Sequence, residues 1–317
     1  MAGTSHRFSA PQRHAQGPQR KPDWLKTRLP QEGQFDEVRA ILDNAGLSTV
    51  CRSARCPNQS ECWGCRTATF LLMGSVCTRA CRFCHVTTGK PEPLAADEPE
   101  RLARAIAQLD LRYAVLTSVD RDDLPDGGAD HFARCVEAIR HAAPEVKIEV
   151  LIPDFGGDTR ALDRVAKAAP DVIGHNLETV ERLTPFVRDA RATYRRSLDV
   201  LARFRAHPAI RTKSSLMLGL GETDDEIIAC FDDLIAAGAS ILTLGQYLQP
   251  SPFHLKVERF VSPDTFARLK EIALSRGFER VAAGPMVRSS YRAGALIDEP
   301  APPGAPVNGT QNTNDRR

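Results

Sequence analysis

Two closely spaced groups of cysteines constrain this 317-residue chain more than any other feature of its sequence. Of its nine cysteines, seven lie between residues 51 and 84. We expect the chain in a reducing cytoplasm, where such crowding indicates metal binding rather than disulfide bonds. The first group is Cys51, Cys56 and Cys62, the second is Cys77, Cys81 and Cys84, and Cys65 is the seventh thiol.

Each group of three is one ligand short of the four that a structural zinc ion or a cubane iron–sulfur cluster takes. The first group has four and then five residues between its thiols, which is wider than the paired knuckles of structural zinc sites. Three-thiol groups suit clusters in which one iron keeps a different ligand. We therefore favour iron–sulfur clusters, with zinc and other thiol chemistry as alternatives. Cys65 is interpreted as a bystander, with membership of the first group or redox reactivity as the alternatives.

Composition and charge argue against several classes of function. The chain has 42% hydrophobic and 26% charged residues, as an ordinary globular protein does. Its net charge of +2 gives no signal for nucleic-acid binding. No apolar run approaches the roughly 18–20 residues of a membrane helix, and the N-terminus lacks the apolar core of a secretory signal. Residues 1–22 and 299–317 are rich in proline, glycine and polar side chains, so we expect disordered tails there.

Between these tails, apolar runs alternate with stretches of helical periodicity. Such alternation predicts right-handed crossovers and a parallel sheet. Six strand–helix units are too few for a complete eight-fold barrel, so we expect an α/β fold, either a partial parallel barrel or an open doubly wound sheet. The predicted strands are 69–73, 113–118, 147–152, 171–174, 212–218 and 240–244, and the predicted helices lie near 99–109, 129–142, 159–168, 197–206, 224–237 and 263–276.

The predicted strands end in polar or glycine-rich residues, such as "TSVDRDD" (117–123), "IPD" (152–154) and "GHNLE" (174–178). In parallel α/β folds, the loops after the strands meet at one mouth and carry the chemistry. The first strand runs directly into "GSVCTRACRFC" (74–84), which brings the second cysteine group to the same mouth. The sequence therefore predicts one site at one end of the sheet.

The second cysteine group resembles the signature of radical S-adenosylmethionine (SAM) enzymes. It has the form Cys-x3-Cys-x2-Cys, with the aromatic Phe83 before its last thiol. In that superfamily the three thiolates hold a [4Fe–4S] cluster, and the amino and carboxylate groups of SAM chelate its fourth iron. Reductive cleavage of SAM then yields methionine and a 5′-deoxyadenosyl radical, which abstracts hydrogen from a C–H bond. The superfamily's partial (β/α)6 barrel agrees with the strand count.

Further segments narrow the resemblance to the lipoyl synthase family, from about Lys21 to Gly294. The first cysteine group stands in "CRSARCPNQSECW" (51–63), and a late Arg-Ser-Ser-Tyr occurs in "AGPMVRSSYRAG" (283–294). Between them lie the similar segments "RYAVLTSVDRDDLPDGGA" (112–129), "LGLGET" (218–223) and "QYLQPS" (246–251). The joint occurrence of two cysteine triads and the terminal motif is highly specific.

This resemblance implies two [4Fe–4S] clusters and a sulfur-inserting activity, that of a radical SAM sulfurtransferase. In the family, an auxiliary cluster donates two sulfur atoms, which are inserted at C6 and C8 of an octanoyl group on a protein lysine, and two SAM molecules are cleaved. One auxiliary ligand is a serine hydroxyl, a poorer iron ligand than a thiolate, which suits an iron that must leave. The implied ligands are Cys77, Cys81 and Cys84 for the radical-generating cluster, and Cys51, Cys56, Cys62 and Ser290 for the auxiliary one.

The resemblance also implies SAM contacts at the strand ends. Gly219 and Gly221 would let the backbone approach SAM, although a tight turn is the alternative reading of so short a pattern. Four polar residues would lie near its sulfonium or ribose, with helix capping as the alternative: Thr117, Ser118, Asn176 and Glu178. The implied organisation is a tail (1–22), an extension carrying auxiliary ligands (23–66), a barrel with the serine-bearing loop (67–298) and a second tail (299–317).

Three kinds of partner are implied: octanoylated lipoyl carrier domains or the glycine cleavage H protein, a ferredoxin- or flavodoxin-type electron donor, and an iron–sulfur cluster delivery protein. The arginine-rich segment 188–205 is either a docking surface for an acidic carrier or a solvated helix face. Two rival functions stay open. One is a different sulfur-inserting radical enzyme that acts on a small molecule, and the other is a non-catalytic zinc-binding protein.

Overall fold

An eight-stranded sheet forms the centre of the described fold, and all of its strands except the first run parallel. The computed structural model describes residues 20–25, 34–54, 56–64 and 69–298. Cys65 and the predicted tails, apart from residues 20–22, lie outside this range. In spatial order the strands are β1 (Ser48–Thr49), β2 (Thr69–Leu72), β5 (Tyr113–Ser118), β6 (Lys147–Leu151), β7 (Val172–Gly174), β8 (Arg211–Leu218), β9 (Ile241–Gln246) and β10 (Arg280–Gly284).

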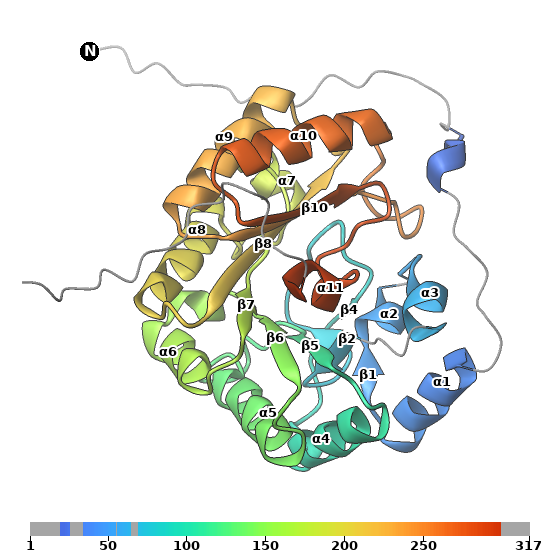
Figure 1. The fold of residues 1–317 in the computed structure, drawn as a ribbon, viewed down its shortest axis with the longest axis vertical. Coiled ribbons are helices and arrows are strands. Elements are labelled where there is room, and N and C mark those ends of the chain that lie inside the picture. The colour runs from blue at the N-terminus through green and yellow to red at the C-terminus, as the bar shows by residue number, and fades with distance from the viewer. Residues whose placement is uncertain (1–19, 26–33, 55, 65–68, 299–317) are drawn as a thin grey trace, which may run out of the picture.

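Helices cover the outer side of this sheet, which curves into an arc (Figure 1). The helices are α1 (Gln34–Asn44), α2 (Val50–Ser53), α3 (Gln59–Gly64), α4 (Glu98–Gln108), α5 (Ala129–Ala142), α6 (Thr159–Lys167), α7 (Thr184–Val187), α8 (Tyr194–Arg203), α9 (Asp224–Ala236), α10 (Pro263–Ser275) and α11 (Ala293–Asp298), with short 3₁₀ turns at Asp23–Leu25, Phe155–Gly157, Glu181–Leu183 and Phe204–Ala206. No helix in the described ranges is long and apolar enough to cross a membrane.

The predicted α/β class and its mainly parallel sheet are confirmed. Each of the six predicted strands and six predicted helices has a counterpart within a few residues. The predicted count of six strands was too low, because β10 extends the parallel sheet beyond β9, from Arg280 opposite Ile241 to Gly284 opposite Gly245. Only Val281 is fully buried among the five residues of β10, so the strand lacks the continuous apolar run that marks its neighbours.

Several helices begin at residues that satisfy their free N–H groups. Thr223 accepts a hydrogen bond from the Glu226 amide, and the Glu226 carboxylate accepts one from the Thr223 amide, which makes a capping box at the start of α9. Ser262 caps α10 in a similar way, through the amide of Thr265. These caps fix the residue at which each helix begins. The loop residues before each cap can therefore face the interior of the arc.

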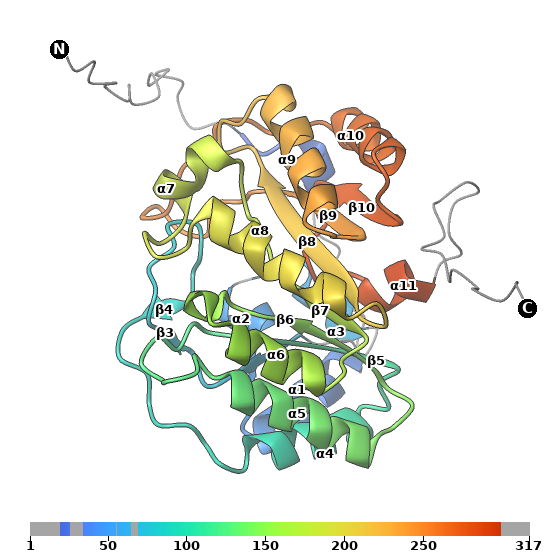
Figure 2. The ribbon, with the colours of Figure 1, turned by 90° about the vertical axis from the view of Figure 1, so that its left-hand side faces the viewer.

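The two ends of the strands differ in what closes them. Figure 2 shows α11 at one end and the small separate sheet of β3 (Val76–Cys77) and β4 (Thr87–Thr88) at the other. Leu296 of α11 packs with Val172 and Ile241, the first residues of β7 and β9. A side chain at Gly294 would meet the Tyr113 Cβ at 3.0 Å, so glycine permits this close approach. The helix α11 therefore covers the N-terminal ends of the strands.

A buried ion pair lies inside the arc near this closed end. The Lys213 Nζ atom is 2.8 and 3.0 Å from the two carboxylate oxygens of Glu149, and each side chain is 2% exposed. The hydroxyl of Tyr113 donates to the same carboxylate at 2.7 Å. Burial, reinforced by the Glu149 charge, raises the pKa of Tyr113 and keeps it protonated. The three residues connect β5, β6 and β8 through one satisfied polar group.

We expect Lys213→Met to destabilise the fold strongly. It leaves the Glu149 carboxylate buried without its cation, which typically costs about 3–5 kcal/mol. Adding Glu149→Gln should recover much of the loss, because the neutral amide still accepts from Tyr113. Thermal unfolding midpoints measure both effects. The control is Asp163→Ala, which breaks an exposed ion pair with Arg203. If the unfolding midpoint of Lys213→Met fell no further than that of this control, the expectation would be contradicted.

Candidate functional site

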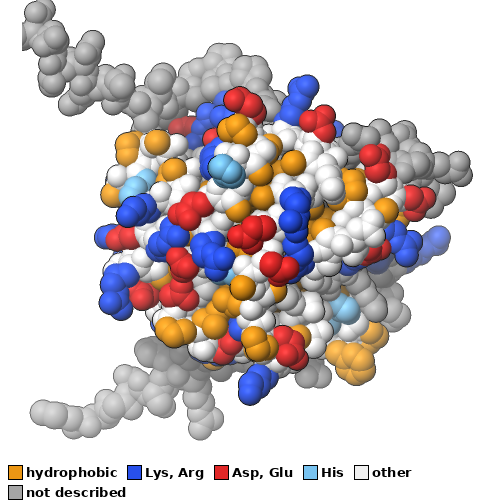
Figure 3. Space-filling view, turned by 90° about the horizontal axis from the view of Figure 1, so that it is seen from below, with side chains coloured by type: hydrophobic (Ala, Val, Ile, Leu, Met, Phe, Trp, Pro, Cys, Tyr) orange, Lys and Arg blue, Asp and Glu red, His pale blue; other side chains and the backbone are white. Residues whose placement is uncertain are grey.

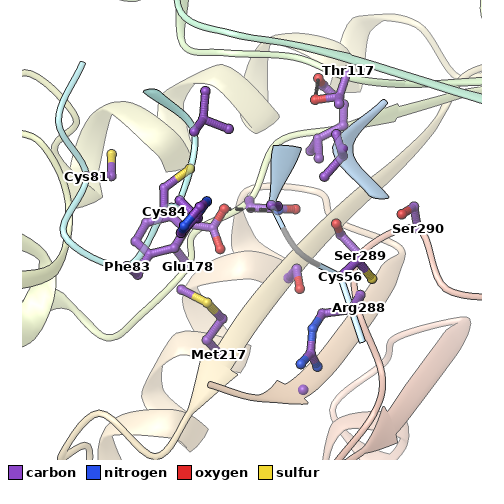
Figure 4. Close-up of a pocket in the computed structure, with 18 of the residues that line it drawn as sticks. Cys56, Cys81, Phe83, Cys84, Thr117, Glu178, Met217, Arg288, Ser289 and Ser290 are labelled. Carbon is purple, nitrogen blue, oxygen red and sulfur yellow. Dashed lines mark hydrogen bonds between the residues drawn. The ribbon is translucent and has the colours of Figure 1, made fainter. Parts of the chain in front are cut away.

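The second cysteine group, together with Cys51 and Cys56 of the first, lines one cavity of about 540 Å³ at the C-terminal ends of the strands. Figure 4 shows Cys81, Phe83 and Cys84 at one end of this space and Cys56 with Ser290 at the other. The structure therefore gathers the residues that the sequence predicted for one mouth. The predicted site residues that line the cavity are Cys51, Cys56, Cys77, Cys81, Cys84, Thr117, Ser118, Asn176, Glu178 and Ser290.

Backbone amides surround the sulfurs of the second cysteine group. The Cys77 Sγ accepts from the amides of Arg79 at 3.4 Å and Asp120 at 3.3 Å, and the Cys81 Sγ accepts from the amide of Asp189 at 3.3 Å. Such donors stabilise thiolates and tune the sulfur ligands of iron–sulfur clusters. Burial raises the pKa of Cys81 to about 12 and that of Cys84 to about 11. A bound metal would overcome this penalty, because coordination deprotonates a thiol.

One buried arginine holds the loop that carries this group. Arg79 lies between Cys77 and Cys81, is 5% exposed, and contacts three carboxylates from the ends of β5 and β6. Its guanidinium is 2.7 Å from Asp122, 2.7 Å from Asp154 and 3.3 Å from Asp120. The hydrogen bond from Arg79 lowers the pKa of Asp122, whereas burial raises that of Asp120 to about 6. Sequence reasoning missed Arg79, although "TSVDRDD" and "IPD" supply its partners.

The first cysteine group meets Ser290 at the opposite end of the cavity. Cys51, Cys56, Cys62 and Ser290 line a second cavity of about 20 Å³ that shares part of its wall with the large one. The hydroxyl of Thr69 donates to the Ser290 Oγ at 2.8 Å. A donor placed there would stabilise a serine oxygen that carries negative charge on a metal. Because the small cavity alone is too small for a cluster, a cluster would extend into the space of the large cavity.

The chemistry of the thiol donors fits iron–sulfur clusters. In the part of the chain that the structure describes, no three Cys, His, Asp or Glu side chains converge closely enough to hold one metal ion. Zinc needs its sulfurs about 2.3 Å from a single centre. A cubane cluster instead takes its thiolates on separate irons, so its ligands stand around a volume rather than a point. The zinc alternative gains no support from these residues.

The polar residues between the two ends carry signs of a ligand site. Glu178 adopts a positive φ of 69°, which is uncommon for this residue and occurs at functional sites. Its carboxylate accepts from the Asn176 amide at 3.1 Å, and burial raises the pKa of Glu178. The Ser118 hydroxyl is buried and has no hydrogen-bond partner in the described structure. The Thr117 hydroxyl donates to the Leu151 carbonyl oxygen at 2.9 Å. A bound ligand would give the Ser118 hydroxyl the hydrogen-bond partner that it lacks in the described structure.

Arg188 is a cavity residue that sequence reasoning assigned only to an arginine-rich segment. It is 8% exposed and lines the cavity. Its described hydrogen bonds go to neutral groups, the Ser197 hydroxyl at 2.7 Å and the Leu177 carbonyl oxygen at 3.5 Å. The same Ser197 hydroxyl meets His175, whose pKa is lowered to about 4 by burial, with the charge of Arg188 contributing. The charge of Arg188 also acts on the nearby Glu178 and Asp120 carboxylates, but neither accepts a described hydrogen bond from it, so its guanidinium can still bind an anionic ligand.

Gly219 and Gly221 do not lie among the residues that line the cavity. A side chain at Gly219 would collide with the Gln246 amide and the Arg259 carbonyl oxygen, both within 2.4 Å of the added Cβ. Both glycines have positive φ values, and the Glu222 carboxylate accepts from the Gly219 amide. The structure therefore favours the tight-turn reading of "LGLGET" and gives no support to direct contact of these glycines with SAM.

The arginine-rich segment 188–205 also has a local explanation. Outside the cavity, Arg191 pairs with Asp189, Arg195 with Asp199, and Arg203 with Asp163. Figure 3 shows another face of the molecule, on which basic and acidic side chains likewise alternate. These pairs favour a solvated helix face over a docking surface for an acidic carrier.

Comparisons with known proteins place the chain among relatives. The Radical SAM superfamily model matches residues 71–234. A lipoyl synthase from Myxococcus xanthus is 57% identical over 275 residues, which cover 86% of this chain and 92% of that protein. A lipoyl synthase from Ectopseudomonas mendocina is 54% identical over 281 residues, which cover 88% and 80%. The crystal structure of methylornithine synthase (PylB) matches with a TM-score of 0.51 at 12% identity, over 76% of this chain and 73% of that one.

These likenesses agree with the arrangement of the site. The superfamily match includes the second cysteine group and the strand ends that surround it. The crystal structure supports the fold alone, because its sequence identity is low. Because it is 57% identical to the Myxococcus relative over 86% of its length, the chain belongs to the lipoyl synthase family of radical SAM enzymes.

Proposed function

We propose that the chain inserts two sulfur atoms, at C6 and C8, into an octanoyl group carried on a protein lysine. One observation carries this proposal: the cavity that the radical-SAM cysteines line at one end is lined at the other by Ser290 and two cysteines of the first group. A radical source and a sulfur source would then face one substrate between them. An enzyme acting on a free small molecule stays the alternative, and no contact in the described residues favours it.

The proposed cofactors are two [4Fe–4S] clusters and SAM. Cys77, Cys81 and Cys84 would hold the cluster that SAM completes, which supplies the 5′-deoxyadenosyl radical when bound. The auxiliary cluster, which would supply sulfur, has four proposed ligands in this chain: Cys51, Cys56, Cys62 and Ser290. Thr69 supports the last of these, because its hydroxyl donates to the Ser290 oxygen and would stabilise that oxygen on iron.

The remaining cavity residues would bind and orient the two organic molecules. Arg188 offers a buried cation to the carboxylate of SAM, and Glu178 offers a carboxylate near its sulfonium or ribose. Thr117, Ser118 and Asn176 add polar groups along the same wall. The apolar side chains of Phe83, Val119 and Met217 line the cavity too and suit an aliphatic chain kept away from water.

The proposed partners follow from this reaction. The substrate would be an octanoylated lipoyl carrier domain or the glycine cleavage H protein. A ferredoxin- or flavodoxin-type protein would donate electrons, and an iron–sulfur delivery protein would rebuild the auxiliary cluster. We propose a cytoplasmic location, since free thiols and oxygen-sensitive clusters require a reducing setting.

Iron analysis after anaerobic reconstitution tests the two-cluster assignment. The chain should bind about eight irons, and alanine at all of Cys51, Cys56 and Cys62 should leave about four, since each cubane has four irons. That variant should still cleave SAM but form no thiolated product. Alanine at all of Cys77, Cys81 and Cys84 should abolish SAM cleavage. Alanine at the buried Cys135 and Cys230 should change neither count, and four irons in the unmodified chain would reject the assignment.

Ser290→Ala tests the serine ligand. The variant should keep SAM cleavage while sulfur insertion falls by at least about tenfold, because losing one ligand or its support typically weakens a metal site 10–100-fold. Thr69→Val should weaken insertion in the same direction and to a smaller extent. Ser289→Ala is the matched control, one residue away. Product yield from octanoyl-peptide measures the effect, and full yield in Ser290→Ala would reject the ligand role.

Arg188→Gln tests the proposed SAM carboxylate contact. Loss of a charged hydrogen bond of about 1.5–3 kcal/mol predicts a roughly 10- to 150-fold weaker affinity for SAM. Arg188→Lys keeps the charge but loses the two-pronged guanidinium geometry, so its affinity for SAM should lie between those of the unmodified chain and Arg188→Gln. Equilibrium binding of SAM to the reconstituted chain measures this. Unchanged affinity, with iron content preserved, would contradict the contact.

A further inference from the structure

A single carboxylate connects the two chain segments that form the auxiliary site. Glu61 lies on α3, directly before Cys62. Its Oε1 atom accepts from the Tyr291 hydroxyl at 2.8 Å and from the Arg292 Nη2 at 2.7 Å. Those two residues directly follow Ser290. We name the contact of Glu61, Tyr291 and Arg292 the terminal clamp.

A second contact between the same segments supports the clamp. The Asn58 side-chain amide, between Cys56 and Cys62, donates to the Met286 carbonyl oxygen at 2.7 Å. Arg292 itself has a positive φ of 48°, a backbone conformation that is unfavourable for a non-glycine residue. The loop therefore needs contacts from outside itself to keep its shape, and the segment of the first cysteine group provides them.

The weakness of a serine ligand explains why this support matters. A hydroxyl binds iron less strongly than a thiolate, so the iron–oxygen bond alone is a poor means of holding a surface loop. We propose that Glu61 is a positioning residue that keeps Ser290 at the auxiliary cysteines through the terminal clamp. This inference rests on the proposed function. Without it, the loop would leave the fourth iron to water.

The clamp is also weak enough to open. The side chains of Glu61 and Arg292 are 30% and 67% exposed, so solvent screens their ion pair and keeps it weak. The Tyr291 hydroxyl donates to the same carboxylate, so the clamp does not depend on the ion pair alone. The clamp is therefore a partly exposed contact that a single substitution can open.

Hydrogen exchange tests the clamp separately from the chemistry. In the anaerobically reconstituted full chain, Glu61→Ala should increase amide exchange across residues 285–292, and Tyr291→Phe should do so less. Asp163→Ala, which removes a carboxylate paired with Arg203, is the control and should leave this segment unchanged. Unaltered exchange in Glu61→Ala would overturn the proposal whether or not the chain inserts sulfur.

Iron release tests the connection to Ser290. In a background with alanine at Cys77, Cys81 and Cys84, only the auxiliary cluster should remain, and its loss to a chelator can be followed by visible absorption. Glu61→Ala should accelerate that loss roughly two- to fivefold, because Glu61 supports the serine only through a partly exposed contact with its neighbours. In Glu61→Gln, the side-chain amide oxygen still accepts from the Tyr291 hydroxyl, so this variant should lose iron more slowly than Glu61→Ala.

The double variant decides whether Glu61 acts through the serine. If it does, Glu61→Ala adds nothing to Ser290→Ala, and both give the same Mössbauer signature for the fourth iron. Independent, additive acceleration would show that Glu61 merely stabilises the fold and would overturn the positioning role. A background that binds no auxiliary iron at all would instead contradict the proposed function, while the exchange experiment still reports on the clamp.

Discussion

The guanidinium of Arg79 fixes the position of the radical-SAM cysteines relative to the sheet. A buried cation must be paired, because an isolated charge in a protein interior costs several kcal/mol. Its carboxylate partners stand on the loops after β5 and β6, and it lies between two of the cysteines. The cysteine loop can therefore occupy only the mouth where these loops meet. The cavity, its polar wall and the distance to Ser290 all depend on that placement.

Much of the fold could be predicted because its strands are buried on both faces. The run Tyr113–Ser118 is almost continuously apolar, and the structure buries its four central residues. The strand Arg280–Gly284 could not be predicted in the same way, because it lies at the edge of the sheet with one fully buried residue. The sequence pattern thus reports burial and gives little signal for an edge strand whose side chains are mostly only partly buried.

The sequence named the proposed ligands of the site, but it revealed less of the residues that surround them. Spacing alone identified the cysteine groups, whereas Ser290 entered only through the resemblance, because no local pattern distinguishes it from other loop serines. Arg188 was hidden among neighbouring arginines that pair on the surface. The positive φ of Glu178 leaves no trace in the sequence. At Gly219, the close approach of Gln246 and Arg259 accounts for the glycine without a ligand.

The contacts of the Ser290 loop join residues 221 to 231 positions apart. Contacts of such sequence separation form late, because the intervening chain must be ordered first. The whole sheet has left the ribosome before Ser290 does. The first cysteine group is therefore made early, but its proposed serine ligand is made only after every strand of the described sheet. An auxiliary site of this design reports on completion of the chain: a product truncated before residue 290 retains the radical-SAM cysteines and lacks the proposed serine ligand of the sulfur source.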